Sequence, residues 1–286
     1  MRCLVAALAV LAAAPAARAD LTAAAGANRA ASPTAATGAS GAASPAAATG
    51  GAVNDLVARP LVLEAGAWLA SLAVELNMET GQYARPISLA PDVWYGVTPR
   101  LTVGVIHSNA SVDLIDAGGG LCLRGDALTC SQVYRGGGLD VRWSWLEGAL
   151  AIAPRGRLLV RDVDPWKPAA TLGAVVRWTT GRYAITGDPY LRLGLANQGL
   201  GNRAALVVPI WLEAQPAAGW RIALHSGWDS ELATWRDGWH VPIGLELTHR
   251  ATDQLDVGLT GGFPHLLGPQ NNAKIRSLSV VVAYRP

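Results

Sequence analysis

Hydrophobic and polar residues alternate along most of the chain after about residue 60. Every second residue between 239 and 248 is apolar, and the residues between them are His, Pro, Gly, Glu and Thr. The same period of two recurs in residues 139–145, 191–195 and 255–259. Because successive side chains of a β-strand point to opposite faces, this alternation predicts strands with one apolar and one polar face.

Twelve segments carry this pattern, with no helical periodicity between them. They are residues 63–77, 88–98, 100–108, 136–147, 149–161, 169–179, 182–195, 204–214, 219–228, 238–249, 254–262 and 275–285. Most are close to the roughly ten residues that a tilted strand needs to cross the hydrocarbon layer, and single-chain bacterial barrels have an even number of strands. The sequence predicts an all-β fold, an antiparallel up-and-down transmembrane β-barrel of about twelve strands. Segment 149–161 is the least regular, and a barrel of ten or fourteen strands is the alternative.

Four prolines fall inside predicted strands, and a closed barrel has no free edge where a missing N–H is harmless. They are Pro154, Pro189, Pro209 and Pro242. We expect each to mark a bulge or the end of a strand.

The connections between predicted strands alternate in length. Tight connections follow every second strand, at residues 98–100, 147–148, 180–181, 215–219 and 250–253. The others are generally longer, at residues 77–87, 108–135, 162–168, 196–203, 229–237 and 262–274. Outer-membrane barrels have short periplasmic turns and long outer loops. This pattern predicts periplasmic termini and places loop 108–135 outside the cell.

The N-terminus has the order of a secretory signal peptide. Arg2 precedes a short apolar run, and Ala17-Arg18-Ala19 is a small-x-small cleavage site, so residues 1–19 are the predicted signal peptide. Residues 20–58 are rich in Ala, Gly, Ser, Thr and Pro, which bury too little apolar area to offset chain entropy. We therefore predict a disordered linker over 20–58 and the barrel over 59–286.

Charge and cysteine content limit the possible partners. The chain has 23 Lys and Arg against 21 Asp and Glu, and removal of the signal peptide leaves 21 of each, which argues against nucleic acid as a partner. Cleavage would also remove Cys3. In an oxidising compartment Cys122 and Cys130 are expected to form a local disulfide. No histidine lies between them, which argues against a metal site. No cofactor or metal is predicted.

Two segments resemble bacterial outer-membrane β-barrel proteins of about twelve strands. Residues 94–104, WYGVTPRLTVG, look like the strand-turn-strand phrase of such proteins, and residues 278–284 look like their C-terminal assembly signal, although Arg285 and Pro286 follow Tyr284. The resemblance covers residues 60–286. It implies an outer-membrane location, contact with membrane lipid, and recognition of the last strand by the barrel-assembly machinery.

The 11 Trp and 6 Tyr lie mainly near predicted strand ends, where amphipathic rings suit the lipid headgroup layer. Alternation alone does not tell the inside of a barrel from the outside, so a soluble sandwich with tryptophan in its core is the alternative.

If the apolar faces meet lipid, the polar faces line a lumen. The predicted lumen residues are Glu75, Asp92, Asp140, Arg142, Arg177, Asp188, Arg192, Glu213, Arg221, His225, His240, Glu246 and Asp256. Their charges nearly balance. One interpretation is a mutually neutralising network that fills a narrow lumen, and the other is a pore lining whose opposed charges set a transverse field. The corresponding functions are a narrow channel for small polar solutes with weak charge selectivity, or a structural surface barrel with a plugged lumen.

A lipid-modifying enzyme is a third hypothesis, because His107 precedes Ser108 and His225 precedes Ser226. A serine nucleophile needs a base within hydrogen-bond reach. Adjacent residues on a strand point to opposite faces, so neither histidine can easily serve its neighbour. We predict no catalytic residues. The sequence leaves the solute and the oligomeric state open.

Overall fold

The computed structural model describes residues 55–114, 119–124, 132–269 and 271–286. The predicted signal peptide, most of the predicted linker, and Cys130 lie outside these residues, so the disulfide stays a prediction. Among the described residues, no helix is both long enough and apolar enough to cross a membrane.

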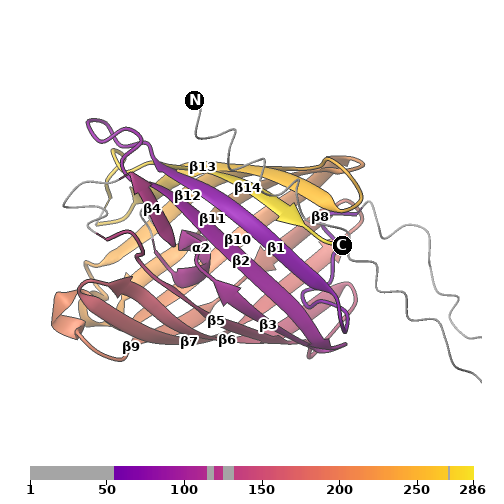
Figure 1. Ribbon diagram of the computed structural model, residues 1–286, viewed down its shortest axis with the longest axis horizontal. Helices are drawn as coiled ribbons and strands as arrows, with labels where there is room; N and C mark the ends of the chain where they lie inside the picture. Colours follow the sequence, from indigo (N-terminus) through magenta and orange to yellow (C-terminus); the bar gives the residue numbers. More distant parts are fainter. Residues whose placement is uncertain (1–54, 115–118, 125–131, 270) are drawn as a thin grey trace, which may run out of the picture. The chain divides into compact units, whose positions relative to one another are not determined.

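The wall is a closed antiparallel barrel of twelve strands (Figure 1). Its strands are β1 (Trp68–Asn77), β2 (Ile87–Thr98), β3 (Leu101–Ile106), β5 (Gly137–Trp143), β6 (Leu150–Val163), β7 (Trp166–Thr180), β8 (Tyr183–Gly187), β9 (Tyr190–Gly194), β10 (Ala205–Ala217), β11 (Trp220–Glu231), β12 (Trp239–Arg250), β13 (Leu255–Leu267) and β14 (Ser277–Tyr284). Strands β8 and β9 share one position, because both pair with β7 on one side and β10 on the other. Pairing of β1 with β14 closes the ring. The predicted fold class and strand number are confirmed.

The exposed and buried faces are reversed relative to a soluble protein. Leu172 is 73 % exposed on the outer face of β7, whereas Asp140 of β5 is 1 % exposed on the inner face. The same alternation follows every long strand, with large apolar side chains outside and charged ones inside. Exposed apolar area of this extent is unfavourable in water and favourable in a bilayer. The outer surface therefore fits lipid, and the soluble sandwich is excluded.

Two of the four prolines mark irregularities in the wall. Pro189 lies in the break between β8 and β9, and Pro242 lies where the pairing of β12 with β13 shifts register. Pro154 and Pro209 are paired without a register shift, Pro154 with Ala174 and Pro209 with Gly227. The expectation of a bulge or a strand end at every proline is therefore wrong for these two.

The two ends of the barrel differ. We call the end with the connections at residues 99–100, 144–149, 181–182, 218–219 and 251–254 the turn rim, and the opposite end the loop rim. The connection between β6 and β7 at the loop rim is only residues 164–165, so the longer loop expected at 162–168 is wrong there. The other loop-rim connections are long, and two contain the short helices η2 (Gln198–Leu200) and η3 (Leu232–Thr234).

The longest connection, from β3 to β5, does not simply extend beyond the loop rim. It contains α2 (Asn109–Val112) and β4 (Leu121–Arg124). β4 pairs with β2 at Ser88 and Leu89, beyond the end of β3. Val112 of α2 is fully buried and belongs to a cluster with Ile106 of β3 and Leu159 of β6. Residues 107–114 of this connection, which include α2, are therefore packed inside the barrel (Figure 1), whereas β4 extends the wall beside β2.

Candidate functional site: the barrel interior

All thirteen predicted lumen residues lie on the inner face of the wall, where they are buried or half-buried. The structure joins seven of them into two networks of ion pairs and hydrogen bonds. It brings Glu75, Asp92 and Arg192 to the inward part of the β3–β5 connection, and Asp256 pairs with arginines near the opposite end of the barrel. His225 and His240 lie apart from these networks. His225 stacks on the Trp211 ring at 4.9 Å, and His240 stacks on the His265 ring at 4.0 Å.

The first network connects β5, β6 and the break between β8 and β9. Asp140 accepts hydrogen bonds from Arg142 Nε at 2.8 Å and from Arg155 Nε at 2.6 Å. The other arm of Arg155 binds Asp188. Trp94 Nε1 also donates to Asp140, at 2.9 Å. Two carboxylates and two guanidinium groups thus neutralise one another, which is what makes charge tolerable in a buried wall.

The second network continues around the ring through β7, β8, β10, β11 and β12. Arg177 Nε donates to Thr186 Oγ1 at 3.0 Å, and Thr186 in turn donates to Glu213. Arg221 lies between two carboxylates, 2.7 Å from Glu213 and in contact with Glu246. Each link joins neighbouring strands, so the network connects the inner wall around this side of the barrel.

The inward part of the β3–β5 connection, residues 107–114, is called the inward loop here. Its first residues donate backbone N–H groups to two acids of the wall. Asp92 Oδ1 of β2 accepts from the N–H of His107 at 2.5 Å and of Ser108 at 2.9 Å. Glu75 Oε1 of β1 accepts from the N–H of Asn109 at 2.7 Å. Both carboxylates therefore anchor the loop.

The other end of the inward loop meets arginines. Asp113 forms an ion pair with Arg192 of β9 and accepts a hydrogen bond from the Tyr190 hydroxyl at 2.7 Å. Its carbonyl oxygen accepts from Arg161 Nη2 of β6 at 2.9 Å. Burial by itself would raise the pKa of Asp113, but the charges of Arg192 and Arg161 outweigh it, so the pKa lies below its ordinary value. The carboxylate is thus held ionised in the lumen.

These contacts show that the inward loop crosses the lumen. Glu75 is on β1 and Arg192 is on β9, and these strands are six positions apart in either direction around the twelve-strand ring. The loop presents N–H groups to the acidic wall and carbonyl and carboxylate oxygens to the basic wall. A segment between walls of opposite charge is stabilised in this orientation. The inward loop therefore crosses the lumen and is anchored to the wall at both of its ends.

A column of arginines on β6 is not among the predicted lumen residues. Arg155, Arg157 and Arg161 all face inward, and Arg157 is only 3 % exposed. The Arg157 guanidinium lies 4.2 Å from the centre of the Tyr190 ring and donates through Nη1 to the Ser111 carbonyl at 3.0 Å. These arginines are two and four residues apart, so the alternation of a strand could have predicted that they share one face. The irregularity of segment 149–161 obscures this signal.

Neither histidine-serine pair forms a catalytic arrangement among the described contacts. Ser108 donates its hydroxyl to Asp92 at 2.6 Å, and His107 Nδ1 lies 2.6 Å from the Pro91 carbonyl oxygen. Ser226 lines a cavity on the outer face of the wall, whereas His225 stacks on Trp211 inside. Across the described ranges, no group of three or more His, Cys, Asp or Glu side chains could hold a metal ion.

Comparison with known proteins places the fold in a class. No protein-family model matches the chain, and no curated protein matches its sequence. Solved outer-membrane porin structures do match. The KdgM porin in complex with disordered oligogalacturonate has a TM-score of 0.51 at 7% identity, covering 76% of this chain and 98% of that one. The NanC porin has a TM-score of 0.53 at 9% identity, covering 74% of this chain and 98% of that one.

This chain therefore has the fold of an outer-membrane porin. Together with the apolar outer surface, that fold indicates an outer-membrane location.

Proposed function

We propose that this protein is a narrow outer-membrane channel for small polar solutes with weak charge selectivity. One observation carries the proposal: the inside of the barrel is charged, the charges of both signs are paired, and an anchored loop reduces the cross-section. A polar lining offers water and polar solutes hydrogen bonds that a lipid-facing surface does not. The orientation that fits this role has the turn rim and both termini in the periplasm, with the last strand recognised during barrel assembly.

The pairing of charges also bears on the kind of solute. Arg155 is shared between Asp140 and Asp188, and Arg221 between Glu213 and Glu246, so no strong excess of either sign lines the wall. A lining of this kind favours small neutral or zwitterionic solutes. The ligand named for the KdgM porin is an oligogalacturonate, which is a carboxylated saccharide, and the balanced interior of this chain favours it less.

Planar-bilayer recording tests the proposal. Wild-type protein should give small single-channel currents, with a reversal potential near zero in a KCl gradient. Arg142→Ala leaves Asp140 with one arginine fewer and should shift the channel toward cation selectivity, whereas Glu246→Ala should shift it toward anions. Arg182→Ala and Asp253→Ala, in exposed residues of the turn rim, are the matched controls and should leave the reversal potential unchanged.

A folded, reconstituted protein that never conducts would overturn the channel and would favour a structural barrel with a plugged lumen. A strongly ion-selective wild type would overturn the weak selectivity alone.

A further inference from the structure

A second segment of the chain lies inside the barrel, at the turn rim. Residues 55–66 precede β1, and we call them the crossing segment. Leu56, Val57 and Val62 are buried, and Val57 has no exposed surface. The predicted disordered linker includes residues 55–58, whereas Leu56 and Val57 are buried against the barrel. Composition did not reveal this, because the apolar residues that are buried here are few and scattered.

Contacts at its two ends carry the crossing segment from one side of the ring to the other. The N–H of Leu56 donates to Gln215 Oε1 of β10 at 2.7 Å. The N–H of Leu63 donates to Thr102 Oγ1 of β3 at 2.7 Å. Strands β10 and β3 are five positions apart around the ring of twelve, so they form nearly opposite walls.

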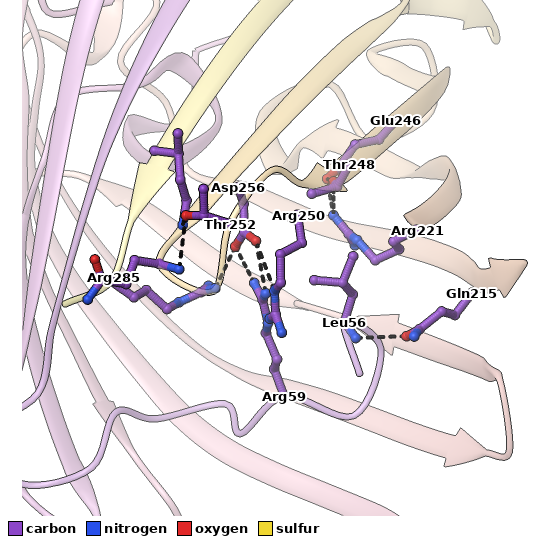
Figure 2. A network of polar contacts seen from close by, with 12 residues as sticks. Leu56, Arg59, Gln215, Arg221, Glu246, Thr248, Arg250, Thr252, Asp256 and Arg285 are labelled. Carbon is purple, nitrogen blue, oxygen red and sulfur yellow. Dashed lines mark hydrogen bonds and ion pairs between the residues drawn. The ribbon is translucent and has the colours of Figure 1, made fainter. Parts of the chain in front are cut away.

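Arg59, in the middle of the crossing segment, bridges another pair of nearly opposite walls. Its guanidinium donates to Asp256 of β13 through Nη1 at 2.5 Å and Nη2 at 3.0 Å (Figure 2). The backbone carbonyl oxygen of Arg59 accepts from Arg177 Nη1 of β7 at 2.7 Å. Strands β13 and β7 are also five positions apart. Asp256 additionally contacts Arg250 and Arg285. The crossing segment thus lies across the opening rather than along the wall.

We infer that the crossing segment is a resident plug of the turn-rim opening, held by the Arg59–Asp256 ion pair and displaced when that pair is broken. This inference rests on the proposed channel function. It adds a second constriction, at the opposite end from the anchors of the inward loop, and assigns to Arg59 the control of passage at that end.

The way the crossing segment is held makes displacement feasible. Each wall strand is hydrogen-bonded to neighbours on both sides, whereas residues 55–63 are held by single hydrogen bonds to the side chains of Gln215 and Thr102 and by Arg59. Segments with few backbone hydrogen bonds open at lower free energy than the sheet around them. The Arg59 side chain is 20% exposed, so salt can reach its ion pair.

Thiol labelling of the full-length protein tests the plug independently of conduction. In Val57→Cys, a thiol replaces a fully buried side chain, and a water-soluble maleimide should label it slowly. Adding Arg59→Ala removes a bidentate, charge-assisted pair, and we expect about a tenfold faster rate, the factor that corresponds to about 1.4 kcal/mol. Protein without the Val57→Cys change gives the background from other thiols.

Arg285→Ala is the matched control, because it removes a different guanidinium from the same Asp256 oxygen, 2.6 Å away, without touching the crossing segment. Added to Val57→Cys, it should leave the labelling rate of the introduced thiol unchanged. Rapid labelling without Arg59→Ala, or equal rates with and without it, would overturn the plug. High salt should accelerate labelling of the Val57→Cys protein that keeps Arg59 more than of the one that also carries Arg59→Ala.

Conductance of the same variants separates the two proposals. If the crossing segment is a plug, the Arg59→Ala channel should open more often or with larger currents than the wild-type and Arg285→Ala channels. Equal conductance in all three would overturn the plug while the channel stands. Faster labelling of the introduced thiol with no current from any variant would instead overturn the channel and leave the crossing segment as a structural cap.

Discussion

Asp113 lies where the inward loop meets the arginine-bearing wall. Its backbone is in the left-handed region, with φ 61°; its carboxylate pairs with Arg192 and its carbonyl oxygen accepts from Arg161. An aspartate tolerates this conformation better than most residues. Because a buried guanidinium without an acceptor is costly, Asp113 and its arginines stabilise the loop mainly by leaving no charge unpaired. Asp113 therefore holds the loop at this wall together with the contact between Arg157 and the Ser111 carbonyl.

Asp113→Ala should lower the free energy of unfolding by about 3 kcal/mol, because it leaves Arg192 in the wall without its carboxylate. Since the pKa of Asp113 is depressed in the folded protein, this contribution is present above the ordinary aspartate pKa and is lost as the pH falls through the depressed value. Urea unfolding of wild type and variant at several pH values measures the loss of unfolding free energy and its dependence on pH. Asp162→Ala, whose nearest cations are 3.7 and 3.8 Å away, should cost less than about 1 kcal/mol. An equal loss of unfolding free energy in the two variants would contradict the role of Asp113 as an anchor of the inward loop.

At the scale of elements, β2 forms the binding surface, or seat, for the C-terminal end of the crossing segment. Gly96 accepts a hydrogen bond from the Gly66 N–H at 2.8 Å and donates one to the Ala67 carbonyl at 2.8 Å. A Cβ atom on Gly96 would lie 1.9 Å from the backbone oxygen of Glu64. Only glycine therefore lets the chain pass this close to the strand.

Gly96→Ala should force residues 63–66 away from β2 and loosen the crossing segment, so that the introduced thiol of the Val57→Cys protein is labelled faster. Maleimide labelling measures the change. Gly199→Ala is the control, because a Cβ atom at Gly199 would meet nothing within 4 Å. If both alanine variants label at the rate of the parent, Gly96 is not part of the seat.

At the scale of the whole molecule, the apolar outer surface and the closed ring make a lipid bilayer the environment in which the protein is stable. A closed sheet satisfies its backbone hydrogen bonds without water, which a bilayer requires, and the outward leucines and valines supply the apolar surface. The charges are confined to the interior and the rims. The molecule is therefore stable in lipid because its polar groups are paired inside, and the pairing also leaves the lumen nearly neutral.

Leu172→Arg, near the middle of β7 on the outer face, should destabilise the folded barrel in lipid vesicles by about 3 kcal/mol, because it places a charge in the hydrocarbon layer. Leu200→Arg, on the exposed η2 helix of the loop rim, should have little effect. The fraction of heat-modifiable protein on unboiled gels after urea treatment gives both values. Similar stability of the two variants would mean that β7 does not face lipid.

The sequence by itself determined the twelve strands, their alternation and their polar residues, because the period of two is a local property of extended backbone and each strand records it independently. It could not determine which side of the sheet faces lipid, since alternation is the same in both cases. The inward loop and the crossing segment were decided only by tertiary structure. Arg192 and Asp113 are 79 residues apart, and Arg59 and Asp256 are 197 residues apart. Such pairs exist only after the ring has closed and brought distant strands around a common interior.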